Sequence, residues 1–270
     1  MLWGLGATAA CALTDTRVAG WLPDWGALVS VATMLVVLLL MRVVDDIRDL
    51  DYDRERNPDR PLARGAVSVR DLAVLLAVGA AVVLAANAWR PGVMAVLAAQ
   101  LGYVAVMVSF ERRTGWPSGD ALFLNYLLAL PAQVLLNGFL YAGLLHAEGL
   151  GPSWSGAVGV VVAAVLFAHF EFARKTTREP RPGERTYVNS LGVRGSAAVA
   201  VGCAVVAVVL LAAAARPWSP AALVVLLPLA FPVVAALRFR GLPRWPYGLA
   251  AAFLLTGFAG PLVVNALELL

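Results

Sequence analysis

The chain has few charged residues, two cysteines and a single lysine. Charged side chains make up 14% of its 270 residues, against 61% hydrophobic residues, and the mean hydropathy is +0.79. This composition excludes an ordinary soluble domain and predicts a polytopic membrane protein. Cys11 and Cys203 both lie in apolar stretches, so neither a disulfide framework nor a thiolate metal site is expected.

Apolar segments suited to crossing a membrane recur along the chain, since a spanning helix needs about 20 residues. We expect them at about 25–44, 72–89, 93–110, 121–144, 155–172, 195–215, 219–237 and 246–267. A shorter apolar segment, 2–13, precedes them and has no basic lead of the kind that begins a cleaved signal peptide. The sequence therefore predicts an all-α protein with nine transmembrane helices, or eight if the first segment does not span.

The basic residues predict the orientation of these helices. If the acidic end of segment 25–44 is cytoplasmic, all but three of the 21 basic residues fall in cytoplasmic connections. The three outer ones are Arg17, Arg90 and Arg216. This bias follows the positive-inside rule, and it explains the basic pI of about 9.4 without nucleic acid as a partner. We expect a multi-pass protein of the cell (inner, cytoplasmic) membrane.

A run of carboxylates, Asp45, Asp46, Asp49, Asp51 and Asp53, closes the second predicted helix. On one continuous helix, Asp46, Asp49 and Asp53 would share a face. Neighbouring charges about 5–6 Å apart on that face repel one another, so we expect a bound cation. Ligands that are all oxygen suit Mg²⁺, often bridging to a phosphate. The alternative is a solvated acidic helix end.

Two cytoplasmic connections, about 45–71 and 171–194, carry far more charge than the others. Both lie on the same predicted membrane face. Carboxylates facing arginines suit a metal-bound diphosphate, because the metal neutralises some oxygens and guanidinium groups bind others. For the second connection alone, ordinary positive-inside charge is an equal alternative. We expect the diphosphate to be bound by Arg56, Arg60, Arg64, Arg174, Lys175 and Arg185.

At these residues the chain resembles the UbiA superfamily of intramembrane prenyltransferases. The family motif N/D-D-x-x-D-x-x-x-D is matched by Asp45-Asp46-x-x-Asp49-x-x-x-Asp53, and R-P-L-x-x-G by residues 60–65. Residues 109–114 resemble its basic fourth-helix end, and Gly183-Glu184-Arg185-Thr186 with Leu191-Gly192 resembles G-x-R-T followed by L-G. The resemblance covers the whole chain. Its first motif is specific, and the others support it.

The resemblance implies one domain over residues 1–270, with about nine transmembrane helices in a ring around a central cavity. The two polar connections would cap this cavity on the cytoplasmic side. A prenyl diphosphate would bind with its diphosphate at the cytoplasmic mouth and its apolar tail inside this cavity, and the lipid bilayer would surround the helices. The Mg²⁺ ligands implied are Asp46, Asp49 and Asp53, with Asp45 where the family usually has asparagine.

The second family motif, D-x-x-x-D, is altered. Its two positions fall on Lys175 and Glu179, and Glu171 lies one step earlier at the same spacing, so the three would form one helical stripe. An ammonium group can contact a diphosphate directly. We therefore expect one Mg²⁺ on the first cluster and Lys175 in place of part of the second. The alternative is that Lys175 only pairs with Glu171 or Glu179.

Mg²⁺, Lys175 and the arginines would stabilise the charge on a departing diphosphate. The allylic cation would form in a cavity shielded from water. Transfer to an acceptor, expected to be aromatic, is slightly favoured over cyclisation by a UbiA-type terpene cyclase, and both remain open. A transporter or structural membrane protein is a third interpretation, but transporters tend to place charges near the membrane midplane.

Polar residues within the predicted helices are further candidates, because intramembrane polar groups often face a functional interior. Asn125, Tyr126 and His169 are the expected cavity residues, and the first and last lie near the cytoplasmic ends of their helices. The alternative is hydrogen bonding between helices. It applies equally to the other polar residues in these segments, Gln100, Tyr103, Gln133 and Asn137.

Overall fold

The structure, a computed structural model, describes residues 1–215 and 220–269. These residues form helices joined by loops, with one isolated β-bridge. The helices are α1 (Leu2–Thr14), α2 (Trp25–Arg48), α3 (Leu50–Arg56), α4 (Val69–Ala86), α5 (Pro91–Thr114), α6 (Leu122–Glu148), α7 (Trp154–Arg174), α8 (Val188–Ala214), α9 (Pro220–Leu226), the 3₁₀ helix Leu227–Leu229, α10 (Ala230–Phe239) and α11 (Tyr247–Glu268).

Seven of these helices, namely α2, α4, α5, α6, α7, α8 and α11, are long and apolar enough to cross a membrane. Two shorter apolar stretches, Leu2–Thr14 and Leu223–Phe239, coincide with the other two predicted segments. The all-α membrane class is thus confirmed. The count of nine spans, the ring and its central cavity stay predictions, and Arg216, expected on the outer side, lies outside the described residues.

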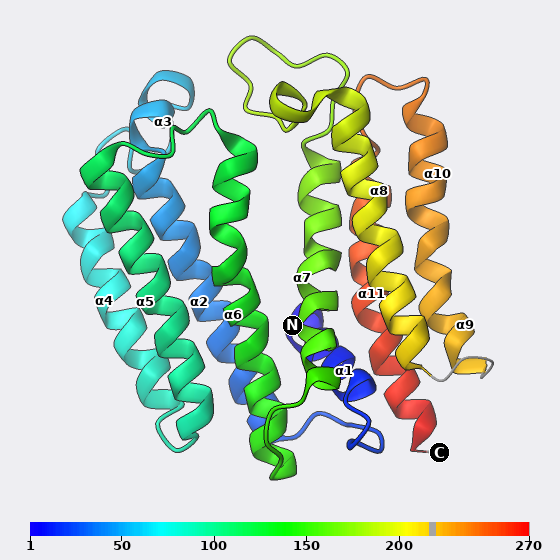
Figure 1. Ribbon diagram of the computed structural model, residues 1–270. Coiled ribbons are helices and arrows are strands. Elements are labelled where there is room, and N and C mark those ends of the chain that lie inside the picture. The colour runs from blue at the N-terminus through cyan, green and yellow to red at the C-terminus, as the bar shows by residue number, and fades with distance from the viewer. Residues whose placement is uncertain (216–219, 270) are drawn as a thin grey trace.

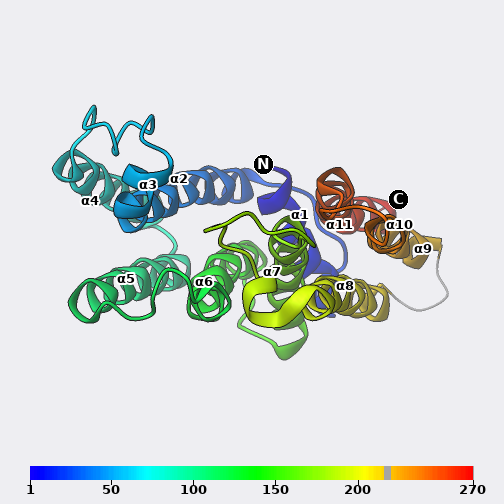
Figure 2. The same ribbon diagram turned by 90° about the horizontal axis from the view of Figure 1, so that it is seen from above.

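The long helices run side by side in two rows (Figures 1 and 2). Seen from above, α4 and α2 lie opposite α5 and α6, and α7 and α8 continue the second row toward α10 and α11 (Figure 2). Helix α1 occupies the half of the bundle away from α3, so the N-terminus lies at mid-height (Figure 1). Its apolar side chains join the central core with those of α2, α7 and α11.

Glycines let α1 approach its neighbours closely. A Cβ on Gly159 of α7 would lie 2.4 Å from the Cα of Cys11, and a Cβ on Gly6 would lie 2.4 Å from the carbonyl oxygen of Phe258 on α11. Small residues at a helix interface allow backbones to pack this tightly inside a membrane. The short helix α1 is therefore held between α7 and α11.

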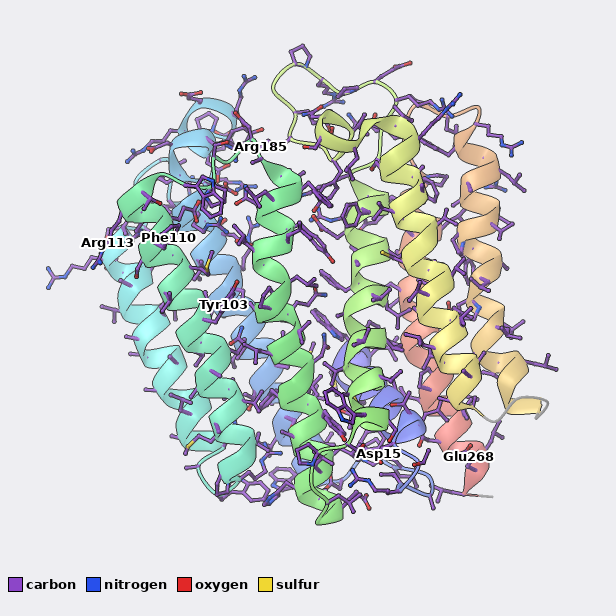
Figure 3. The ribbon with its side chains drawn as sticks, in the orientation of Figure 1. Asp15, Tyr103, Phe110, Arg113, Arg185 and Glu268 are labelled. Carbon is purple, nitrogen blue, oxygen red and sulfur yellow. The ribbon has the colours of Figure 1, made fainter. Side chains whose placement is uncertain are left out.

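A buried carboxylate, Asp15, joins three elements at the end of the molecule opposite α3 (Figure 3). It accepts hydrogen bonds from Arg17 Nη2 at 2.7 Å, from the Tyr141 hydroxyl of α6 at 2.9 Å and from the Ser153 hydroxyl at 2.9 Å. Ser153 also caps α7 by accepting from the backbone N–H of Gly156. The Arg17 guanidinium holds the pKa of Asp15 well below its usual range.

Candidate functional site

The two charged connections, about 45–71 and 171–194, meet at one end of the bundle, above α2, α6 and α7 (Figure 1). We call this end of the molecule the mouth. Arg185 of the α7–α8 loop joins the two connections (Figure 3): its Nη1 donates to Asp49 Oδ1 at 3.2 Å and its Nε to Asp120 Oδ1 at 3.3 Å. Its guanidinium also lies 4.3 Å from the ring centre of Tyr52. One side chain therefore contacts α3, the turn before it and the α5–α6 loop.

The aspartates do not share one continuous helix, so that expectation was wrong. Helix α2 ends at Arg48, and α3 begins at Leu50 after Asp49, whose φ and ψ are −88° and 6°. Aspartate is a weak residue inside helices because its short carboxylate competes for backbone hydrogen bonds. As a result Asp46 lies on the last turn of α2, Asp49 at the break and Asp53 on α3.

Arg60 lies between two of these carboxylates. Its Nη1 is 2.5 Å from Asp53 Oδ2 and 3.7 Å from Asp46 Oδ1. Asp53 is 3% exposed and also accepts from Asn57 Nδ2 at 2.8 Å. Asp46 Oδ1 also forms an ion pair with Arg42 Nη2 at 2.7 Å, although the geometry of this contact is not that of a hydrogen bond. A guanidinium thus stands where two carboxylate oxygens converge.

These residues fit a divalent cation. Positive groups already lie against Asp46 and Asp53, with Arg60 bridging the two, and carboxylate oxygens suit Mg²⁺. The cluster is not preassembled: within residues 1–215 and 220–269, no three His, Cys, Asp or Glu side chains converge as metal ligands. Each acidic side chain is paired with an arginine instead. Asp45 lies 3.8 Å from Arg48, and Asp51 lies 3.1 Å from Arg54.

The second motif surrounds Glu171, a largely buried residue of α7. Its Oε1 lies 3.0 Å from Lys175 Nζ and accepts the Tyr187 hydroxyl at 3.0 Å, and its Oε2 accepts Arg174 Nε at 2.6 Å. Burial and the Glu171 carboxylate raise the pKa of Tyr187, so this hydroxyl is a stable donor. The alternative pairing of Lys175 with Glu171 is therefore present in this structure.

The expected stripe of Glu171, Lys175 and Glu179 was also wrong. Helix α7 ends at Arg174, Lys175 is its C-cap and Glu179 lies in the loop beyond. The chain leaves the helix here because Thr177 turns to the α10–α11 loop, where its hydroxyl donates to the Pro243 carbonyl at 3.0 Å. Lys175 nevertheless lies beside the Tyr187 ring, 5.6 Å from its centre.

Two other predicted diphosphate ligands, Arg56 and Arg64, differ in their surroundings. The Arg56 guanidinium lies against Gly183 of the α7–α8 loop, where an added Cβ would be 2.7 Å from Nη2. Arg64 is exposed and forms no ion pair in the part of the chain that the structure describes. Asn125 lies at the mouth, 3.4 Å from Arg48 Nη2, and Arg48 Nε also donates to Glu111 Oε2 at 2.6 Å.

The candidate cavity residues carry both hydrogen-bonded polar atoms and unpartnered ones. His169 directs Nδ1 to the Ala200 carbonyl of α8 at 2.8 Å, and Tyr103 donates to the Leu128 carbonyl at 2.7 Å (Figure 3), as in ordinary contacts between helices. Asn137 likewise accepts from Trp3 Nε1 at 3.1 Å. Among the described residues, buried polar atoms without a hydrogen-bond partner include the Tyr126 hydroxyl, the second ring nitrogen of His169 (Nε2), Gln100 Oε1 and Gln133 Nε2.

Sequence reasoning missed several residues at the mouth. Asp120 and Tyr52 contact Arg185, Tyr187 donates to Glu171, and Arg48 joins α2 to α5 and α6. The hydrogen-bonded pairs among them are 16 to 77 positions apart in the sequence, so no spacing pattern indicates them. Arg48 and Tyr52 lie at open positions of the first family motif, and Glu111 lies inside the segment that resembles the family's fourth-helix end.

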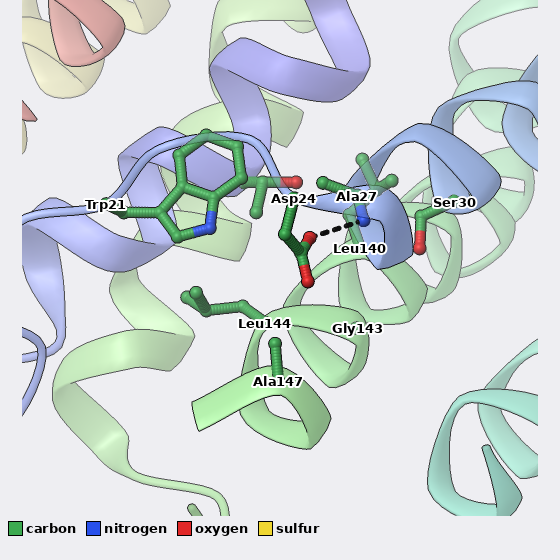
Figure 4. Close-up of a pocket in the computed structure, with 9 residues that line it drawn as sticks. Trp21, Asp24, Ala27, Ser30, Leu140, Gly143, Leu144 and Ala147 are labelled. Carbon is green, nitrogen blue, oxygen red and sulfur yellow. Dashed lines mark hydrogen bonds between the residues drawn. The ribbon is translucent and has the colours of Figure 1, made fainter. Parts of the chain in front are cut away.

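A small pocket lies at the opposite end of α2 and α6 (Figure 4). Its lining includes Trp21, Ser30 and Gly143, together with Asp24, which caps α2 by accepting from the Ala27 backbone N–H at 2.7 Å. None of the predicted site residues lines it. The pocket is therefore separate from the charged mouth.

Comparison with known proteins identifies the architecture. No known family profile matches the chain. The apo structure of a UbiA homolog from Aeropyrum pernix superposes with a TM-score of 0.62 at 21% identity, covering 99% of this chain and 96% of that one. The chain has the UbiA fold. The resemblance seen in the sequence motifs is thus confirmed.

A curated protein is similar to the chain in sequence. Digeranylgeranylglyceryl phosphate synthase from Methanoculleus marisnigri is 27% identical over 197 residues, which are 70% of this chain and 67% of that protein. In the UbiA fold of the present chain, the acidic break between α2 and α3 and the α7–α8 loop come together at one end.

Proposed function

We propose that the chain is a Mg²⁺-dependent intramembrane prenyltransferase. It ionises an isoprenyl diphosphate and transfers the prenyl group to an acceptor, for which an aromatic compound is the class we expect. The observation that carries the proposal is the pairing of Asp46, Asp49 and Asp53 with Arg60 and Arg185 at one end of a UbiA fold. The relative's name denotes a product that carries geranylgeranyl groups, which supports prenyl transfer.

The charged side chains would change partners when substrate binds. Mg²⁺, held by Asp46, Asp49 and Asp53 with Asp45 beside them, would supply positive charge to the departing diphosphate. Arg60 and Arg185, released from these carboxylates, are then free to donate to diphosphate oxygens as planar forks. Lys175 adds a compact positive charge at the same mouth. The arginines that neutralise the resting site thus become ligands of the substrate.

Aromatic side chains lie directly inside this charged layer. The Phe172 ring centre is 4.3 Å from that of Tyr187 and 5.0 Å from that of Tyr126. When the allylic carbon–oxygen bond breaks, its electron pair leaves with the diphosphate and the carbon becomes cationic. Ring faces within about 6 Å attract such a cation. The acceptor's nucleophilic atom then forms the new bond to carbon and loses its proton.

A UbiA-type terpene cyclase would use the same ionising residues, so only the product distinguishes the two reactions. Purified protein in detergent is supplied with geranyl, farnesyl or geranylgeranyl diphosphate and Mg²⁺, without an acceptor and then with aromatic acceptors. Diphosphate release and the organic extract are analysed, the latter by gas chromatography–mass spectrometry. We expect a prenylated product only with an acceptor. A cyclic terpene without one would replace transfer by cyclisation, and no turnover with any combination would contradict both.

A further inference from the structure

The α10–α11 loop pairs with the α7–α8 loop at the charged end of the molecule (Figure 1). The backbone N–H of Arg178 donates to the Pro243 carbonyl at 2.7 Å, and that of Trp245 donates to the Thr176 carbonyl at 3.1 Å. Thr177 and Arg244 form an isolated antiparallel bridge between these bonds. The start of the α7–α8 loop is thus anchored to a segment about 60 residues later in the chain.

A two-pronged ion pair extends this anchor along the loop. Arg244 Nη1 lies 2.9 Å from Glu184 Oε1, and Nη2 lies 2.9 Å from Oε2. Such a fork restricts orientation as well as distance. Glu184 also accepts from the Arg181 backbone N–H at 2.9 Å, and its carbonyl accepts from Asn189 Nδ2 at 3.1 Å. Hydrogen bonding from Arg244 lowers the pKa of Glu184, which keeps this carboxylate charged.

The residue after Glu184 is Arg185, whose guanidinium extends to Asp49, Asp120 and Tyr52. It is packed closely, because a Cβ on Gly119 would lie 2.4 Å from Arg185 Nη2. Neighbouring side chains in a non-helical segment cannot move independently of their shared backbone. Whatever holds Glu184 in place therefore also limits where Arg185 can reach.

We propose that Arg244 is a positioning residue: its fork on Glu184 holds the α7–α8 loop so that Arg185 faces the diphosphate site. This inference rests on the proposed function for the identity of the ligand. Arg244 acts through Glu184 and the loop, while Arg185 is the residue that would touch the substrate. The α10–α11 loop is thereby part of the site's construction, although it carries none of the UbiA motifs.

The test uses two readouts on the full-length protein in detergent. Hydrogen–deuterium exchange of the 176–187 segment reports loop order without any substrate, and initial rates report KM and kcat for the prenyl diphosphate. For Arg244→Ala we expect faster exchange in this segment and a KM raised about fivefold, the size expected for losing a partly exposed ion pair. We expect kcat to stay within about twofold. Arg240→Ala, an exposed arginine of the same loop, is the matched control.

Charge reversal makes the test specific. Arg244→Glu and Glu184→Arg should each loosen the loop, and the double variant should recover protection and KM because the pair is rebuilt with opposite sign. Unchanged exchange in Arg244→Ala, or faster exchange with an unchanged KM, would overturn the proposal. If the wild-type protein turns over no prenyl diphosphate, the proposed function fails, and the exchange data alone decide whether Arg244 orders this loop.

Discussion

At the residue scale, the mouth of this protein is a set of carboxylates whose charge is balanced by arginines. Arg60 forms ion pairs with Asp46 and Asp53, and Arg185 forms one with Asp49. Without these partners the aspartates would repel one another across a short break in the chain. On the proposed function, ligand binding would exchange these partners, which makes the individual pairs suitable targets for substitution.

Asp49→Asn and Asp53→Asn remove one negative charge each while keeping side-chain size. We expect Mg²⁺-dependent release of diphosphate to fall by a factor of about 10² to 10³, with the protein still monodisperse in detergent. Asp51→Asn is the control, because Asp51 is exposed and pairs only at 3.1 Å with Arg54. If Asp49→Asn and Asp53→Asn release diphosphate as fast as Asp51→Asn and the wild type, these aspartates take no part in the mechanism.

Lys175→Gln tests whether the lysine takes part in ionisation. Glu171 keeps Arg174 and Tyr187 as donors, so the fold should persist while one positive charge is lost at the mouth. We expect turnover to fall about tenfold and more Mg²⁺ to be needed for half-maximal rate. Turnover and Mg²⁺ dependence that both match the wild type would mean that Lys175 only pairs with Glu171.

Asp15 gives a pH-dependent prediction at the opposite end of the molecule. Its pKa is lowered in the folded state by Arg17, so its stabilisation is complete above the usual aspartate pKa of about 3.9 and is lost as pH falls toward the folded value. Asp15→Asn should destabilise the protein by about 1–3 kcal/mol at neutral pH. Thermal unfolding in detergent should show that the stability difference between the wild type and Asp15→Asn becomes smaller below about pH 4. A constant difference across that range would contradict the assignment.

At the element scale, the fold depends on how closely helices can approach and where they stop. Helix α1 lies against the backbones of α7 and α11 at Gly159 and Gly6. Helices α2 and α7 both end at the charged mouth, at Arg48 and Arg174. These endings place Asp49 and Lys175 in turns, where their side chains can reach partners on other elements.

Gly159→Ala tests the contact between α1 and α7. The added methyl would lie 2.4 Å from the Cα of Cys11, and overpacking of this kind costs about 1–3 kcal/mol. Gly202→Ala in α8 is the control, since nothing lies within 4 Å of its added Cβ and alanine is favoured over glycine in helices by up to about 1 kcal/mol. We expect the melting temperature in detergent to fall for the first variant only. A fall of equal size in both would show that the contact is not tight.

At the scale of the whole molecule, charge is segregated between the two ends. The mouth holds the aspartates and most arginines, and the other end holds the Asp15 network and the pocket beside Asp24. By the positive-inside rule, the end of a membrane protein that carries most of the arginine and lysine residues faces the cytoplasm. It predicts that the mouth faces the cytoplasm.

Cysteine labelling in cells tests this orientation. In a variant lacking Cys11 and Cys203, single cysteines are placed at Asp59 in the α3–α4 loop and at Gly151 in the α6–α7 loop, both of which are exposed. A membrane-impermeant maleimide should label Gly151→Cys in intact cells and Asp59→Cys only after permeabilisation. The reverse pattern would invert the predicted topology.

Much of this architecture could be predicted from the sequence. Long apolar runs mark helices because a bilayer cannot hydrogen-bond an open backbone, and the nine predicted segments coincide with helical stretches in the described residues. The ion pair between Asp51 and Arg54 is equally local, since the two residues are three positions apart on one short helix. The motifs around Asp46 and Arg185 indicated the UbiA fold before any contact was known.

Other features were decided only by the tertiary structure. The break at Asp49, the bridging position of Arg60 and the fork between Arg244 and Glu184 all depend on contacts between elements distant in sequence. Sequence by itself determined which segments enter the membrane and where charge gathers, because transfer of side chains into lipid depends on local composition. Tertiary structure decided which charges pair, because an ion pair depends on distances of a few ångströms that only the packed helices set.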